Sequence, residues 1–154
     1  MKIVHKRAYH DYSISETIEA GIFLTGAEVK SIKTGHMNLE GSFVRIIGSE
    51  VYLVNAQVYP YPYARQEGYD QKRSRKLLLH KKEIISLKTK IESQRLTLIP
   101  LECYTIGSLI KLKIGIGKGK KEYEKREKIK RRDIERDVER ELRGKKNSQR
   151  SSLS

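Results

Sequence analysis

Apolar and polar side chains alternate along much of residues 1–117, and this period of two restricts that part of the chain to β-strands. The clearest run is Tyr12–Leu24, in which every second residue is apolar except Glu16, and the other face carries the polar Ser13, Ser15, Thr17 and Glu19. We expect one long strand here, bent at Gly21, where a side chain is missing. The body of the chain is therefore expected to be mainly β.

A β-hairpin is expected in the next part of the sequence. Its strands are Phe43–Ile47 and Glu50–Val58, and they flank Gly48-Ser49. This two-residue connection has glycine in its first central position, as a type II′ turn requires.

A second pair of strands, Arg95–Thr105 and Ser108–Ile116, is expected around Gly107. Pro100 lies inside the first of these strands. Proline has no N–H to donate to a ladder, so we expect an edge or a bulge at this position.

Helical spacing interrupts the strands at Ala27–Lys33, which Gly35 closes, and at Lys81–Glu92. About six strands with helical inserts in roughly 115 residues favour a small barrel. The expected fold is a mainly β, small closed OB-type β-barrel with two or three short helices and a basic C-terminal tail.

Positive charge is concentrated at the end of the chain. The net charge is +14, and residues 118–154 carry 15 basic and 8 acidic side chains, which is half of that excess in 37 residues. This segment has few apolar residues and cannot bury a core of its own. We place the domain boundary at Gly117 and expect a tail over 118–154 that is disordered alone and helical on binding. A polyanion is the first partner to consider.

Sequence signatures of catalysis are missing. The chain contains no H-E-x-x-H, C-x-x-C or G-x-S-x-G pattern, and the Gly115–Lys120 run does not match a phosphate-binding loop. His10 and Asp11 are adjacent in an expected strand, so their side chains should point to opposite faces. The single Cys103 permits no internal disulfide and no cysteine-based zinc site. We expect a non-enzyme without metal or cofactor, and, with no apolar run of ~20 residues, a soluble cytosolic protein.

Two segments suit RNA. Gln71–Lys76 places four cations in six residues just before Leu77–Leu79, although a solvated loop is the alternative. Tyr59–Tyr63 holds three tyrosines on a proline-stiffened backbone, and these rings are equally suited to stacking on bases or to packing in the barrel.

Several motifs together resemble the bacterial SsrA-binding protein family, also called small protein B, in order from about Lys6 to Asp133. They are Lys6–Tyr12, Glu19–Ile22, Leu24–Ser31, Arg75–Lys81, Leu96–Leu101 and Gly117–Lys121 with Tyr123 and Lys125-Arg126. Two departures are His5, where the family usually has Asn, and Glu124, where it usually has Asp.

The resemblance implies an OB-type barrel that binds the tRNA-like end of transfer-messenger RNA, one copy per RNA, and brings it to stalled ribosomes for trans-translation. It also implies a tail that enters the vacant decoding centre and messenger channel. The RNA-facing candidates are Glu19, Glu28, Lys30, Asn38, Arg73, Arg75, Lys76 and Leu78. The decoding-centre candidates are Lys118, Lys120, Lys121, Tyr123, Lys125 and Arg126.

Alternatives remain for single residues and for the function. Glu28 is equally suited to a structural role in its short helix, and Asn38 to forming a turn. An RNA-modifying enzyme would use the same basic surface but would need a nucleophile, metal or cofactor site. A general OB-type translation factor that binds only ribosomal RNA is the closer competitor.

Overall fold

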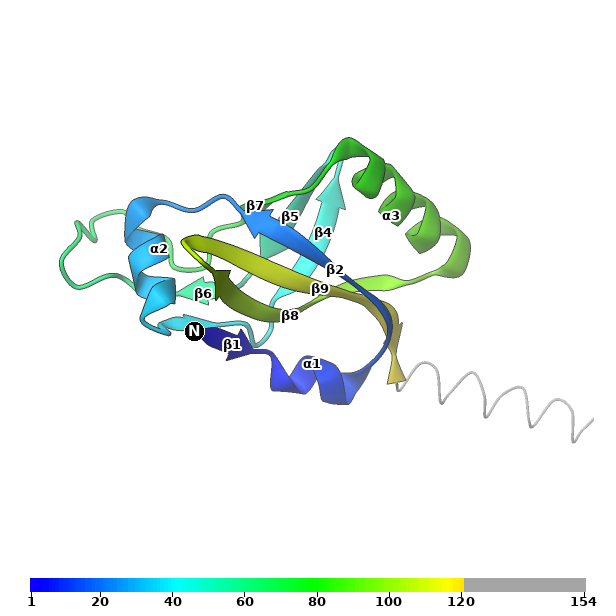
Figure 1. The fold of residues 1–154 in the computed structure, drawn as a ribbon, viewed down its shortest axis with the longest axis horizontal. Helices are drawn as coiled ribbons and strands as arrows, with labels where there is room; N and C mark the ends of the chain where they lie inside the picture. The colour runs from blue at the N-terminus through cyan, green and yellow to red at the C-terminus, as the bar shows by residue number, and fades with distance from the viewer. Residues whose placement is uncertain (121–154) are drawn as a thin grey trace, which may run out of the picture. The chain divides into compact units, whose positions relative to one another are not determined.

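The computed structural model describes residues 1–120, which form a mainly β fold with three helices (Figure 1). The elements are β1 (Lys2–Val4), α1 (Lys6–Asp11), β2 (Tyr12–Ile22), α2 (Gly26–Lys33), β3 (Met37–Asn38), β4 (Phe43–Ile47), β5 (Glu50–Val54), β6 (Gln57–Val58), β7 (Arg75–Leu78), α3 (Lys81–Gln94), β8 (Thr97–Ile106) and β9 (Leu109–Gly119).

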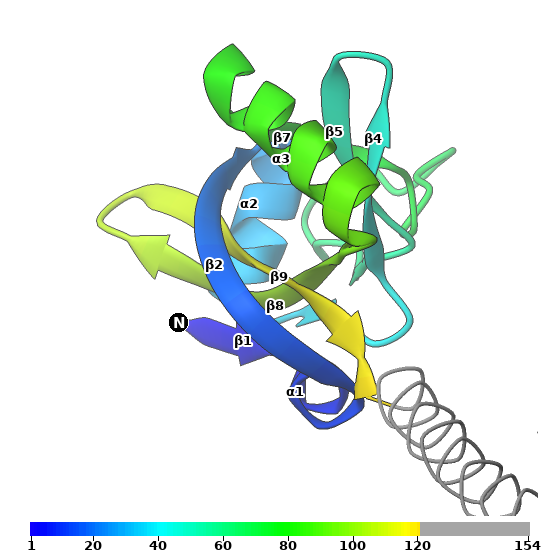
Figure 2. The ribbon, with the colours of Figure 1, turned by 90° about the vertical axis from the view of Figure 1, so that its right-hand side faces the viewer.

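Seven strands form one antiparallel sheet in the order β1-β8-β9-β2-β7-β5-β4, and β3 pairs with β6 in a separate ribbon. The long strands β2 and β9 curve together (Figure 2). The hydrogen-bonded order begins at β1 and ends at β4, so over residues 1–120 no ladder closes the barrel that the sequence predicts.

The gap in the ladder lies between β4 and the first half of β8. These strands contact each other, but side chains of Val44, Ile46 and Leu98 line a cavity between them. Pro100 offers no N–H here, and the β8–β9 register shifts between Pro100 and Glu102, which confirms the expected bulge. The expected closed barrel is thus corrected to an open curved sheet whose edges meet through side chains.

The first expected hairpin forms around Gly48, whose φ of +63° is the positive value that a type II′ turn requires at that position. Its second strand is shorter than expected. Asn55 has a φ of +65°, which ends β5 at Val54, and β6 then pairs with β3 instead. The expectation of one strand from Glu50 to Val58 is therefore wrong.

Strand β2 ends two residues earlier than expected, and its pairing register with β9 shifts between Ile14 and Glu16. The missing side chain of Gly21 matters for packing against β7. A Cβ built on Gly21 would lie 3.3 Å from Leu78 Cβ, so the missing side chain makes room for Leu78.

The two expected helices are confirmed as α2 and α3. Thr25 caps α2 through a capping box with Glu28, and Gly35, with a φ of +80°, follows its end. Helix α3 extends two residues beyond the expected end and stops at Arg95, whose backbone adopts the left-handed conformation.

Helix α1 was not expected. Ala8 is its buried residue and packs with Ile99 and Leu101 of β8. Because His10 and Asp11 lie in this helix rather than in a strand, their side chains meet, with Nδ1 of His10 3.0 Å from Oδ1 of Asp11. The expectation that these two side chains point to opposite faces of a strand is therefore wrong, and both residues are exposed.

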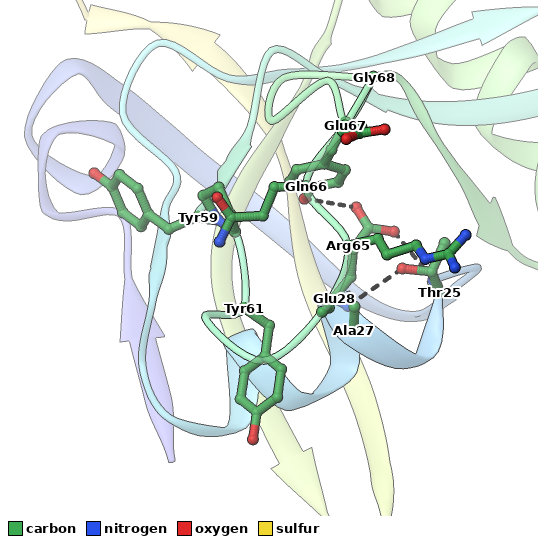
Figure 3. Close-up of a pocket in the computed structure, with 12 residues that line it drawn as sticks. Thr25, Ala27, Glu28, Tyr59, Tyr61, Arg65, Gln66, Glu67 and Gly68 are labelled. Atoms are coloured by element: carbon green, nitrogen blue, oxygen red, sulfur yellow. Dashed lines mark hydrogen bonds between the residues drawn. The ribbon is translucent and has the colours of Figure 1, made fainter.

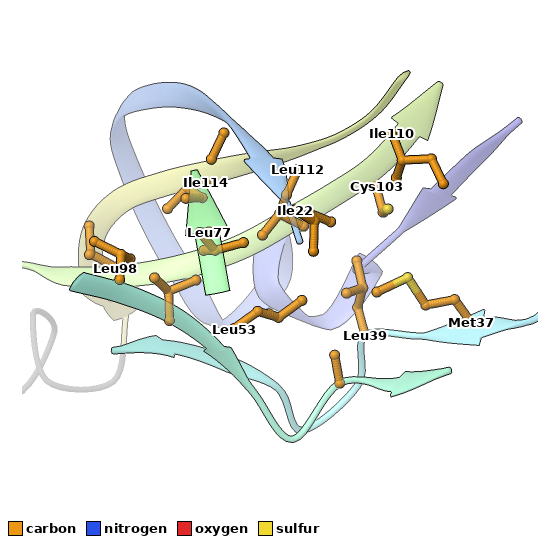
Figure 4. Close-up of a cluster of buried hydrophobic side chains, with 14 of the residues drawn as sticks. Ile22, Met37, Leu39, Leu53, Leu77, Leu98, Cys103, Ile110, Leu112 and Ile114 are labelled. Atoms are coloured by element: carbon orange, nitrogen blue, oxygen red, sulfur yellow. The ribbon is translucent and has the colours of Figure 1, made fainter. Parts of the chain in front are cut away.

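The core lies on the inner face of the curved sheet and includes Ile22, Leu53, Leu77, Leu112 and Ile114 (Figure 4). These residues come from β2, β5, β7 and β9, so the core joins the strands that carry the candidate site. Within residues 1–120, no helix combines the length and the apolar character needed to span a membrane.

Candidate nucleic-acid interface

Strand β7 divides the candidate residues between two faces of the sheet. Arg75 and Leu77 point inward, with 0% and 2% of their surfaces exposed, whereas Lys76 and Leu78 are exposed. Successive side chains of a strand point to opposite faces, so this division follows from the period of two. The motif therefore supplies both a buried cation and an outward-facing one.

The buried cation, Arg75, is held by a dense set of acceptors. Its Nε donates to Oε2 of Glu28 at 2.7 Å. Its Nη1 donates to the carbonyl of Ala56 at 2.8 Å, and its Nη2 to the carbonyl of Gln71 at 3.0 Å. Arg73, in the preceding loop, also donates to Glu28, through Nε at 3.2 Å and through Nη2.

Glu28 is the anion at the centre of this ionic cluster, which we define as Glu28, Arg73 and Arg75. Only 1% of Glu28 is exposed. Burial raises the pKa of its carboxyl group, but hydrogen bonds from Arg73, the Thr25 N–H and Arg75 outweigh that effect and lower the pKa to about 2. The carboxylate is therefore charged throughout the physiological pH range.

The ionic cluster connects segments far apart in the sequence. It links α2 to β7 and to the loop over residues 59–74, and Ser31 of α2 adds a hydrogen bond to the carbonyl of Tyr59 at 2.5 Å. The Tyr69 hydroxyl donates to the carbonyl of Val58 at 2.9 Å, and its oxygen lies 3.2 Å from Oε2 of Glu28. The geometry thus gives Glu28 and Arg75 a positioning role, because their side chains are buried.

A cavity of about 400 Å³ lies beside the ionic cluster, between the start of α2 and residues 59–69 (Figure 3). Tyr59 and Tyr61 line it, and the Tyr61 ring also lies 5.6 Å from Nζ of Lys30 in a cation–π contact. Tyr63 packs edge-on against Tyr61, with ring centroids 5.5 Å apart, yet 88% of it is exposed. Of the two uses considered for these tyrosines, packing fits the half-buried Tyr61, whereas Tyr59, at 39% exposed, and Tyr63 leave the choice open.

The outward-facing candidates share the other side of the sheet. Glu19 on β2 accepts a hydrogen bond from the Tyr104 hydroxyl, which reaches it from β8 across β9. Burial and this bond raise the pKa of Tyr104 to about 12. Lys76 forms an ion pair with Glu50 at 3.0 Å. Leu78 is 51% exposed beside them, so an apolar side chain lies among charged ones.

Asn38 lies away from these groups, in the small ribbon of β3 and β6. Its Oδ1 accepts the N–H of Glu40 at 2.9 Å, the geometry of the turn-forming role that the sequence left open. His5, one of the two departures from the family pattern, is buried with its Nδ1 2.7 Å from the carbonyl of Pro100. It therefore joins the start of α1 to β8.

Two decoding-centre candidates fall within the described residues. Lys118 is half-buried near the end of β9, and Lys120 is exposed just after it. The other four lie outside the described residues: Lys121, Tyr123, Lys125 and Arg126.

No cluster of three or more histidine, cysteine or acidic residues that would suit a metal ion occurs in residues 1–120. Cys103 is buried, and burial raises the pKa of its thiol to about 12.

Sequence reasoning missed Phe23, which is 64% exposed just past the end of β2. A signal for it exists, because Phe23 stands an even number of residues from Glu19 and Gly21. An unbroken period of two places all three on the same face of the sheet.

Comparison with known proteins gives consistent matches over most of the chain. The family described as SmpB protein matches residues 3–144. The chain is 49% identical to the SsrA-binding protein of Chloroflexus aggregans over 90% of this chain and 88% of that one, and 48% identical to that of a Sulfurihydrogenibium species over 92% and 93%. A solved structure described as "tmRNA-SmpB: a journey to the center of the bacterial ribosome" is similar at 43% identity, with a TM-score of 0.64, over 77% of this chain and 84% of that one.

Proposed function

Because this chain belongs to the SmpB protein family, we propose that it is a trans-translation factor, which binds the tRNA-like part of transfer-messenger RNA and brings it to stalled ribosomes. The observation that supports this most directly is the structure of the Arg75–Leu78 motif. It fixes a loop from inside and presents Lys76 and Leu78 on the outside. A folded RNA is recognised by shape, stacking and phosphate contacts, and this arrangement supplies a fixed loop, an exposed apolar side chain in Leu78 and an exposed cation in Lys76.

The candidate residues divide into two roles in this proposal. Glu19, Lys30, Lys76 and Leu78 contact RNA from exposed positions. Glu28, Arg73 and Arg75 hold the 59–74 loop in place, so their loss acts through the loop. Asn38 contributes through its turn. The curved sheet acts as the OB-type barrel, with side chains between β4 and β8 in place of a closing ladder.

The tail has its own role. Lys118, Lys120, Lys121, Tyr123, Lys125 and Arg126 engage the vacant decoding centre, and the rest of 118–154 follows the messenger channel. Peptide transfer remains the work of the ribosome, so this protein positions RNA and is not an enzyme. It acts as one copy per RNA in the bacterial cytoplasm, where ribosomes are.

A binding experiment tests the RNA-facing surface. The full-length chain should bind transfer-messenger RNA well above bulk tRNA. Lys76→Ala should weaken binding and reduce the slope of log K against log salt by roughly one phosphate contact. Lys90→Ala is the matched control, because Lys90 also pairs with a carboxylate, Glu16, but lies on α3. Equal affinity of the wild type for both RNAs would contradict the proposal.

A tagging experiment tests the tail. β9 runs to Gly119, which pairs with Tyr12, so a truncation must keep residues 1–119 to spare the sheet. This form should retain RNA binding and lose tagging of stalled peptides, and Tyr123→Ala with Lys125→Ala and Arg126→Ala should reproduce much of that loss. Full tagging by the truncated protein would contradict this part of the proposal.

A further inference from the structure

Phe23 continues the pairing of β2 with β7 by one residue. Gly21 pairs with Leu78 and Ile22 with Leu77, and the N–H of Phe23 donates to the carbonyl of Lys76 at 2.9 Å. In this register, Phe23 stands opposite Lys76. Its backbone is therefore fixed even though it lies just past the strand.

The register also decides which side chains share a face. Ile22 and Leu77 point into the core, so Phe23 and Leu78 point outward on the other side. They are diagonal neighbours across two strands, and such neighbours lie within reach of an aromatic side chain. We name Phe23 and Leu78, which are 64% and 51% exposed, the apolar platform.

Charged and polar groups surround the apolar platform. Lys111 of β9 pairs with Gly21 on one side, and Tyr52 of β5 pairs with Lys76 on the other. The two nearby carboxylates already have partners, since Glu19 accepts from Tyr104 and Glu50 from Lys76. A ligand on the platform therefore meets an apolar surface bordered by Lys111 and by the Lys76–Glu50 ion pair.

We propose that the apolar platform receives one unpaired base of the bound RNA, which stacks on the Phe23 ring while Lys76 and Lys111 face the adjoining phosphates. This rests on the proposed function and specifies how the outer face recognises its RNA. An unpaired base presents an apolar face and an anionic backbone together, and that combination matches this surface. The platform is also continuous with Glu19, Lys76 and Leu78 of the proposed interface.

Three substitutions of Phe23 in the full-length chain separate the ring from its apolar area. Stacking predicts that Phe23→Ala and Phe23→Leu weaken binding of transfer-messenger RNA by about 5- to 150-fold, whereas Phe23→Trp binds as the wild type does. The slope of log K against log salt should stay unchanged in Phe23→Ala, because stacking releases no counterions. Ile85→Ala is the matched control, since Ile85 on α3 is also 64% exposed, and its affinity should equal that of the wild type.

Fluorescence gives a second, independent measurement. The chain has no tryptophan, so Phe23→Trp introduces a single reporter whose emission should be quenched by bound RNA, while that of Ile85→Trp should not. Wild-type affinity in Phe23→Ala or Phe23→Leu, or an unquenched tryptophan in the complex, overturns the platform and leaves the proposed function standing. Failure of the wild type to bind this RNA overturns both.

Discussion

Replacing Glu28 by Gln should destabilise the fold strongly, because this substitution removes the charge of the ionic cluster while keeping the size of the side chain. The carboxyl pKa falls from 4.5 to about 2 on folding. Each tenfold change in proton affinity is worth about 1.4 kcal/mol, so the carboxylate contributes about 3 kcal/mol to the free energy of unfolding at neutral pH. Breaking a buried pair on one side leaves an uncompensated cation, which also costs about 3 to 5 kcal/mol.

The pH dependence has a definite sign. A carboxyl group whose pKa is lowered on folding stabilises the protein above its unfolded value of 4.5. That contribution is lost as the pH falls from 4.5 toward 2, where the folded protein takes up the proton. The wild type should therefore lose its advantage over Glu28→Gln progressively in this range.

Urea unfolding followed by circular dichroism measures both effects in the full-length chain. Glu16→Gln is the matched control, because Glu16 pairs with Lys90 at 2.6 Å but both side chains are well exposed, and it should cost only about 0.2 to 1 kcal/mol. A loss of stability in Glu28→Gln no larger than that in Glu16→Gln would contradict the stabilising role of the buried carboxylate. An equal difference in unfolding free energy between wild type and Glu28→Gln at about pH 6 and about pH 3 would contradict it as well.

Three further results are expected. Gly117→Ala should cost at least about 3 kcal/mol of unfolding free energy, because its Cβ would lie 2.0 Å from a backbone oxygen of β2. Gly119→Ala, whose Cβ would have its nearest contact at 3.9 Å, should change the unfolding free energy by no more than about 0.5 kcal/mol, and chemical denaturation measures both values. Cys103 should react with a thiol reagent only at the rate of unfolding, since it is buried and its thiol pKa is raised to about 12, and fast labelling of the native protein would contradict this. In an NMR titration, Glu19→Gln should lower the pKa of Tyr104 from about 12 toward 10, because the charged hydrogen-bond acceptor is removed.

Several features of the fold could be predicted because they depend on neighbouring residues. The period of two identified β2 and β9, the two-residue hairpin connection identified β4, and helical spacing identified α2 and α3. Glycine marked the turn at Gly48, and proline marked the bulge at Pro100. Local sequence patterns did not predict elements that form through contacts with distant parts of the chain. Helix α1 forms over six residues that bury only Ala8 against β8, and six residues give too weak a signal to stand out from a strand.

That Lys76 and Leu78 share a face and that Arg75 lies on the other could be predicted from the sequence, because side-chain direction alternates along any strand. The groups that each face contacts depend on how the chain folds. Arg75 finds Glu28 from 47 positions away, and this pairing makes a buried cation tolerable. Which charges are locked in an ionic cluster and which remain for RNA depends on burial, since an ion taken out of water requires a partner that the folded chain alone brings to it.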